Sequence, residues 1–97
     1  MSITTVTRFH ATRGQEETLL ELQTEGRRRM IAADGCESFD ILRDQSDRQS
    51  FVFIQTWVSR EAHDSAFAEL ILASGHLEKV LAVLDEGVSQ TFYEPVS

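Results

Sequence analysis

The 97-residue chain contains a single cysteine, Cys36. One cysteine excludes an intrachain disulfide framework and a cluster of thiolate metal ligands within one chain. A nucleophilic role for this thiol would need a nearby base, and its sequence neighbours supply none. We therefore expect Cys36 to be a small, buried or half-buried residue of a strand.

Positive charge is scarce as well. Nine lysine and arginine residues stand against 16 aspartate and glutamate residues, which gives a net charge of −7. Proteins that bind nucleic acid neutralise its phosphates with basic side chains, so this balance argues against a nucleic-acid partner. The only basic cluster is the run of three arginines at residues 27–29. Three consecutive helical residues fan over about 200°, so we expect a solvated helix end there.

Long apolar runs are absent. No stretch approaches the roughly 20 apolar residues that a membrane-spanning helix needs. The first residues lack the basic segment and apolar core of a signal peptide. The sequence thus predicts no membrane partner and a cytoplasmic location. Repeats and linkers are missing too, so residues 1–97 are expected to form one domain around one core.

The chain does contain an ordered series of strand and helix patterns. Segments rich in β-branched and aromatic residues predict four strands, at residues 3–10, 36–44, 50–59 and 88–96. Apolar residues at helical spacing predict a first helix over residues 12–34, with Thr12 and Gln15 as a capping box. A second helix is predicted to begin after Ser59 as its N-cap and to be interrupted at residues 74–75.

This order, β-α-β-β-α-β, predicts an α+β ferredoxin-like fold with a four-stranded antiparallel sheet. Its helices cover one face of the sheet and leave the other bare. The strand at residues 50–59 is apolar on both faces, and one of them carries Phe51, Phe53 and Trp57. Monomers rarely expose apolar patches of that size. We therefore expect a homodimer in which a second sheet covers the aromatic face and encloses a cavity.

Three motifs follow one another in a set order. The segment "GCESFDILRDQSDRQSFVFIQTWVSREAHDSAF" precedes "SGHLEKVLAVL" and a closing "TFYEPV". This succession, from about Thr7 to Val96, resembles the antibiotic biosynthesis monooxygenase domain. The resemblance implies a dimeric α+β barrel. It also implies one of several activities found in that family, among them cofactor-independent oxidation of phenols, quinol oxidation and haem degradation, although many members have no known activity.

The oxygenase activity implied by the resemblance has simple requirements. A deprotonated phenol or quinol can itself pass an electron to O2, so the protein needs a dry apolar cavity and a base, but no cofactor or metal. We expect a small apolar aromatic or quinone-like ligand, with Gln55 orienting a phenolic oxygen. The predicted binding residues are Thr7, Phe9, Phe53, Gln55, Trp57 and Phe67.

The three histidines show no metal-ligand spacing. His76 is the predicted base, because it occupies the family's Ser-x-His position and histidine ordinarily titrates near neutral pH. His10 and His63 are expected at the surface.

Other functions stay open at this point. The same cavity can hold a metabolite without chemistry, in a ligand-binding or stress-related dimer, or the apolar face can be dimer core with no cavity at all. Haem binding or degradation is a further alternative. The haem-degrading relatives carry an asparagine, a tryptophan and a histidine at positions that match Thr7, Ala66 and either His76 or Leu81 here. The asparagine and tryptophan are missing, and so is the histidine that many oxygenase relatives carry at the Ala66 position.

Overall fold

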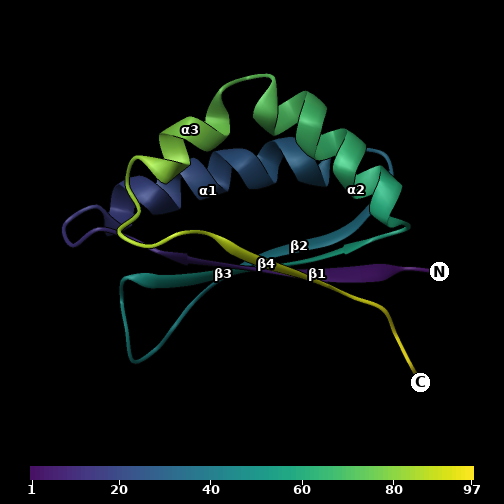
Figure 1. The fold of residues 1–97 in the computed structure, drawn as a ribbon, viewed down its shortest axis with the longest axis horizontal. Helices are drawn as coiled ribbons and strands as arrows, with labels where there is room; N and C mark the ends of the chain where they lie inside the picture. Colours follow the sequence, from purple (N-terminus) through teal and green to yellow (C-terminus); the bar gives the residue numbers. More distant parts are fainter.

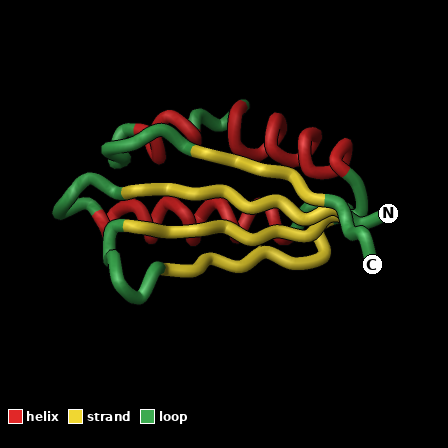
Figure 2. The backbone as a smooth tube through the Cα atoms, turned by 60° about the horizontal axis from the view of Figure 1, so that its bottom comes forward, coloured by secondary structure: helices red, strands yellow, loops and turns green.

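The computed structural model describes residues 1–97 and confirms the α+β ferredoxin-like fold (Figure 1). The strands are β1 (Ile3–His10), β2 (Cys36–Arg43), β3 (Ser50–Trp57) and β4 (Ser89–Tyr93). The helices are α1 (Glu16–Ile31), α2 (Arg60–Ala66), the π-helical η1 (Phe67–Leu72) and α3 (His76–Leu81). All strands pair antiparallel in the order β2-β3-β1-β4, and the helices form a layer on one face of the sheet (Figures 1 and 2). No helix combines the length and apolarity that crossing a membrane requires.

The aromatic face of β3 is the one that packs beneath the helices. Phe51, Gln55 and Trp57 are buried, and Trp57 has an exposed fraction of 0% within the single chain. The expectation that a second subunit covers this face is therefore wrong. The helical layer needs large side chains beneath it to fill the space above the sheet, and the phenylalanines and the tryptophan of this face supply that volume.

The opposite face of the sheet carries smaller aliphatic side chains in its middle, with Arg8 and Asp40 beside them in the ladder. Val52 and Ile54 of β3 point away from the helices, and Val6 of β1 pairs with Ile54 in the ladder. On β2, Leu42 pairs with Val52 and has an exposed fraction of 49%. No other element of the chain covers these residues, so the open face of the sheet is apolar in its centre (Figure 1).

The core consists of two clusters that meet at Phe53. One cluster contains Phe9, Ala11, Leu19, Phe51 and Val80. The other contains Met30, Phe39, Trp57, Ala66 and Ile71. Phe53 packs edge-on against Phe9 and Phe39, with ring centroids 4.6 and 4.9 Å apart. The space between the clusters is incompletely filled, and the candidate site lies there.

The starts of the two long helical segments differ from each other. Helix α1 begins at Glu16 without a side-chain cap, so the capping box predicted at Thr12 is wrong. A tight turn with Gly14 at φ +92° moves the helix start away from that threonine, and the Glu16 carboxylate accepts a hydrogen bond from the Gly14 N–H at 2.8 Å. Ser59 is confirmed as the N-cap of α2, because its hydroxyl accepts a hydrogen bond from the Ala62 N–H at 3.1 Å.

The second helix does not continue as a regular α-helix. Its second half, η1, is π-helical, and the Ala73 N–H donates to the Ala68 carbonyl five residues back, at 3.0 Å. The Ser74 hydroxyl closes this segment by donating to the Leu70 carbonyl at 2.9 Å. Gly75 then turns the chain with φ +75°, a conformation that other residues rarely adopt. The predicted interruption at residues 74–75 is confirmed, whereas the π-helical turn has no obvious sequence signal.

The arginine run at the end of α1 is only partly solvated. The guanidinium of Arg27 donates to the Phe39 carbonyl of β2 at 2.7 Å, and that of Arg29 donates to the Leu70 carbonyl of η1 at 3.2 Å. Only the middle arginine is exposed at the helix surface. The expectation of a wholly solvated helix end is therefore wrong, because two of the three side chains tie α1 to its neighbours.

Candidate functional site

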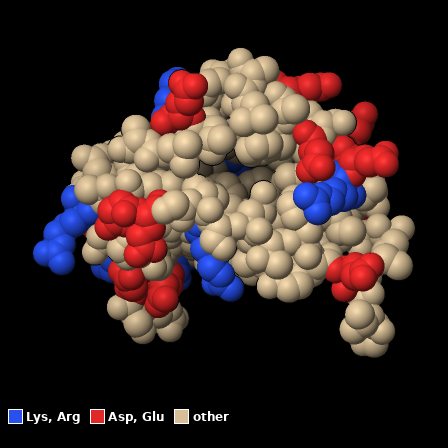
Figure 3. Space-filling model, viewed as in Figure 1, with Lys and Arg blue, Asp and Glu red and all other residues tan.

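A cavity of about 90 Å³ lies between the sheet and the helices. Figure 3 shows a hollow between the helical layer and the sheet in the same view as Figure 1. The sheet side and β4 contribute Thr7, Phe9, Phe39, Phe53, Gln55, Val88 and Gln90. The helix side contributes Leu22, Gln23, Gly26, Met30, His63, Phe67, Ile71, His76, Leu77 and Val80. No aspartate, glutamate, lysine or arginine lines the cavity, so it suits a neutral ligand.

The structure brings most of the predicted site residues together. The cavity lining includes Thr7, Phe9, Phe53, Gln55, Phe67 and His76. Trp57 lies outside the lining. It fixes the orientation of Gln55, because its indole N–H donates to the Gln55 Oε1 at 2.8 Å. This bond leaves the amide nitrogen of Gln55 as the group that is free to face a ligand.

His76 is buried at the first turn of α3. Its Nε2 lies 2.8 Å from the Leu22 carbonyl of α1. A carbonyl only accepts hydrogen bonds, so Nε2 carries the proton in the neutral ring and Nδ1 keeps its lone pair. Gly26 makes the close approach of the ring possible, since a Cβ at that position would lie 3.3 Å from the His76 Nε2.

A second imidazole, His63 of α2, lines the same cavity, and its expected surface position is wrong. Its exposed fraction is 3%, and its Nδ1 lies 2.9 Å from the Asp64 Oδ1. The ring meets Trp57 edge-on at 5.5 Å and stacks on Phe67 at 5.9 Å. His63 precedes Ala66 by three residues and Phe67 by four, and this helical spacing indicates that its side chain shares their buried face.

Gln23 of α1 also belongs to the site, although it was not predicted as a site residue. Its exposed fraction is 1%, it lines the cavity, and neither its amide nitrogen nor its amide oxygen has a hydrogen-bond partner. The Thr7 hydroxyl, on the sheet side of the cavity, is also buried without a partner. Gln23 lies four residues after Leu19 and three before Gly26. This spacing places it on the buried stripe of the helix, where a polar residue is unusual.

Cys36 is half-buried in β2, as expected. Burial raises the pKa of its thiol, and the Arg27 guanidinium lowers it to a smaller extent. A thiol with a raised pKa stays protonated at neutral pH and is a poor nucleophile. We therefore assign it no part in the chemistry of the site.

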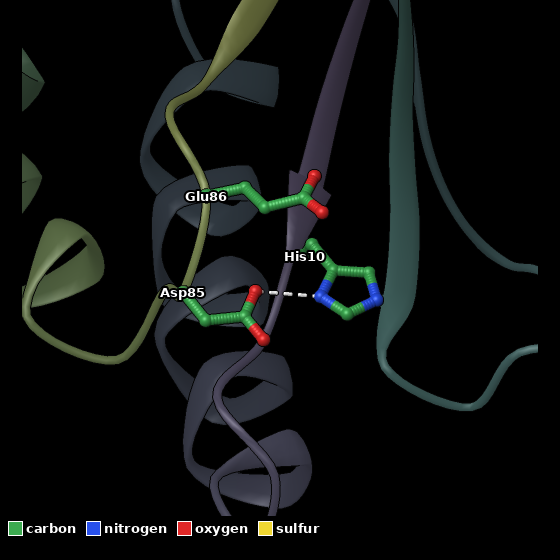
Figure 4. A group of neighbouring side chains, drawn as sticks. All are labelled: His10, Asp85 and Glu86. Carbon is green, nitrogen blue, oxygen red and sulfur yellow. Dashed lines mark hydrogen bonds and ion pairs between the residues drawn. The ribbon is translucent and has the colours of Figure 1, made fainter.

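A separate polar cluster surrounds His10, outside the cavity lining (Figure 4). The ring Nδ1 lies 2.6 Å from the Asp85 Oδ1, and Nε2 lies 3.0 Å from the Asp47 Oδ2. Ligand atoms of His10, Asp85 and Glu86 lie within 4.8 Å of one another, a spacing that a metal ion can bridge. Carboxylates already hold both ring nitrogens, however, so an ion pair accounts for the arrangement.

Replacing His10 by glutamine is expected to make stability less dependent on pH above about pH 6.5. Asp85, followed by Asp47, raises the pKa of His10 above the ordinary 6.5. The stabilisation is therefore complete below pH 6.5 and is lost as pH rises through the folded pKa. The Gln49 N–H holds the pKa of Asp47 low, so this carboxylate stays ionised throughout. Urea unfolding at several pH values checks this: the wild type should lose its advantage over His10→Gln at high pH, and a constant difference would contradict the assignment.

Comparisons with known proteins agree with this architecture. The family model for antibiotic biosynthesis monooxygenase matches residues 2–69. No curated protein sequence matches the chain. Among solved structures, Rv0793 from Mycobacterium tuberculosis superposes with a TM-score of 0.90 at 21% identity, covering 100% of this chain and 97% of its own.

Two further structures have the same fold. SnoaB, a cofactor-independent oxygenase from Streptomyces nogalater, superposes with a TM-score of 0.86 at 18% identity and covers 99% of this chain and 94% of its own. A structure described as antibiotic biosynthesis monooxygenase gives a TM-score of 0.89 at 20% identity, with 98% and 99% coverage. Identities this low support the fold only, but the family match spans more than half of the sequence. On that match, the chain belongs to the antibiotic biosynthesis monooxygenase family.

Proposed function

We propose that the protein is a cofactor-independent monooxygenase that oxidises a single-ring phenol or quinol with O2. The observation that carries this proposal is the cavity of about 90 Å³ lined by aromatic side chains and two imidazoles, without any carboxylate, lysine or arginine. Such a site can remove a phenolic proton while it keeps water away from the phenolate. The description of SnoaB as a cofactor-independent oxygenase supports the same chemistry.

The reaction balances with O2 as the only co-reactant. The base takes the phenolic proton, and the phenolate passes one electron to O2, which gives a radical pair that combines at a ring carbon. That carbon loses its hydrogen and keeps one oxygen atom, so the phenol becomes a quinone. The second oxygen atom leaves as water. The substrate supplies all four electrons that O2 accepts, and no external reductant is needed.

His76 acts as the base in this proposal. Its Nδ1 has a lone pair and no hydrogen-bond partner, whereas its Nε2–H is held by the Leu22 carbonyl. That contact places the ring against the turn of α1 that also carries Gln23. The ring also approaches Gly26 closely, so a ligand beside this turn of α1 lies next to the imidazole. Gln55 orients the ligand with its free amide nitrogen, and Trp57 positions Gln55 rather than touching the ligand.

The size of the cavity argues for a small substrate. Drug-sized ligands occupy pockets of about 300–1,000 Å³, and an engineered cavity of about 150 Å³ accepts benzene. At about 90 Å³, this cavity takes a single ring only if the ring protrudes toward the exposed Gln90 or side chains of η1 move outward. Haem does not fit, and the Leu22 carbonyl already occupies the His76 Nε2 that would otherwise bind its iron.

We further propose that the protein works in the cytoplasm as a homodimer built on the open face of the sheet. Val6, Leu42, Val52 and Ile54 leave an apolar centre on that face that nothing in the chain covers. A second copy presents the same surface, so a two-fold axis through the sheet buries both patches at once. Sedimentation at micromolar concentration gives twice the monomer mass if this is correct, and a monomer would contradict it.

Oxygen uptake by the purified, EDTA-treated protein tests the proposed activity. Hydroquinone, catechol and 4-methylphenol are supplied as substrates, and reactions with heat-denatured protein give the rate of autoxidation. We expect saturable uptake and a product that contains one atom from ¹⁸O2. Saturable binding under nitrogen combined with no uptake in air would contradict the proposal and would favour a ligand-binding protein instead.

A further inference from the structure

The proposed function leaves one feature of the cavity unexplained, the unpaired amide of Gln23. This side chain is 1% exposed in the middle of α1, and both of its polar atoms lack a partner. More than about 90% of buried polar groups in proteins are hydrogen-bonded. An amide buried without a partner destabilises a protein by roughly 1–3 kcal/mol. A methionine of the same length would fill the same space without that loss.

The arrangement around Gln23 indicates that its partner lies outside the chain. Its neighbours on the buried stripe of α1 are Leu19, Gly26 and Met30, which offer no side-chain hydrogen bond. Both Gln23 and Thr7 line the cavity, one from the helix side and one from the sheet side. The Thr7 hydroxyl is unpaired as well. Two unpaired polar groups therefore face the same cavity from opposite walls.

The chemistry of a primary amide defines what can pair with it. A glutamine offers one N–H donor and one carbonyl acceptor on the same carbon. A ligand that pairs with both polar atoms needs a hydrogen-bond acceptor and a donor on neighbouring substituents, as in a catechol or an ortho-hydroxy carbonyl compound. A carboxylate lacks the donor, and no lysine or arginine in the lining would balance its charge. Phe9 and Phe53 on the sheet side provide flat apolar contacts for a ring.

We propose that Gln23, with Thr7, makes the site selective for a neutral single ring that carries two vicinal oxygens, at least one of them a hydroxyl. One oxygen accepts from the Gln23 Nε2–H, and the neighbouring hydroxyl donates to the Gln23 Oε1. The proposal rests on the proposed function for the identity of the ligand as a phenol. It goes further in naming the substitution pattern and the residue that recognises it.

Binding under nitrogen tests this selectivity without any turnover. Calorimetric titrations compare two matched probes, 4-methylcatechol and 4-methylphenol, on the wild type and on Gln23→Met. We expect the wild type to bind the catechol at least about 10-fold more tightly, because 4-methylphenol lacks the second oxygen and leaves one polar atom of the Gln23 amide unpaired. Gln23→Met should bring the two affinities together, because the catechol loses two hydrogen bonds to the amide and the phenol loses only one. Thr7→Val is a second variant and should reduce the preference by a smaller factor.

The outcomes separate this inference from the proposed function. Equal affinity of the wild type for both probes, or an unchanged preference in Gln23→Met, would overturn the role of Gln23 and leave the phenol site standing. Binding of neither probe would overturn both. Gln23→Met is expected to melt at a higher temperature than the wild type, because it removes an unpaired buried amide. A higher melting temperature with an unchanged catechol preference would show that Gln23 holds only water.

Discussion

The variant His76→Gln is expected to lose at least about 100-fold in kcat for phenol oxidation, because general base catalysis typically contributes about 10²–10⁴-fold. Glutamine can still donate its amide hydrogen to the Leu22 carbonyl, which now accepts from the Nε2 of His76 at 2.8 Å. It cannot supply the lone pair of Nδ1. The variant thus removes the proposed base and keeps the contact between α3 and α1. Circular dichroism and urea unfolding should show a folded protein.

The matched control is His63→Gln, which changes the other imidazole of the same cavity. His63 lies beside Trp57 and Phe67 and has its Nδ1 on the exposed Asp64. The ring contacts of His63 are with Trp57, Phe67 and Phe92 rather than with α1, so we expect less than about a 10-fold loss in kcat for this variant. Unchanged turnover in His76→Gln, or an equal loss in both variants, would contradict the assignment of the base.

The fold could be predicted because its signals are local. The alternating β-branched and aromatic residues of β1 and β3 and the apolar stripe of α1 each determine one element, and their order allows few topologies. The orientation of β3 could not be predicted in the same way. Val52 and Ile54 are as apolar as Phe51 and Phe53, so period-2 alternation does not distinguish the two faces of this strand. Only the volume needed beneath the helices decides between them.

The sheet side of the site could be predicted more completely than its helix side, where only Phe67 and His76 were anticipated. Thr7, Phe9 and Gln55 share one face of the sheet through strand alternation alone. Gln23 and His63 were missed because polar residues on amphipathic helices usually face solvent, and their burial depends on how the helices rotate against the sheet. The cavity itself results from packing between two core clusters, which no local pattern encodes.

The variant Trp57→Ala is expected to lower the free energy of unfolding by about 3–5 kcal/mol, the usual result of truncating a buried aromatic residue. Small domains are stable by only about 5–15 kcal/mol. Trp57 has an exposed fraction of 0% and belongs to the cluster that contains Met30, Phe39 and Ile71. Urea unfolding followed by circular dichroism measures the change. The milder Trp57→Phe keeps a ring in the core and removes the indole N–H that holds Gln55.

Measuring stability and sedimentation at several protein concentrations distinguishes a Trp57 in a subunit interface from a Trp57 in the core of its own chain. A tryptophan in a subunit interface would give a loss of stability linked to dissociation, so the sedimentation coefficient of the variant would fall. A tryptophan under the helices of its own chain lowers stability and leaves association unchanged. Ile54→Asp, on the other face of the same strand, should show the reverse: a monomer whose helices and strands remain folded. If Trp57→Ala dissociated the protein and Ile54→Asp did not, the aromatic face would have to be the interface after all.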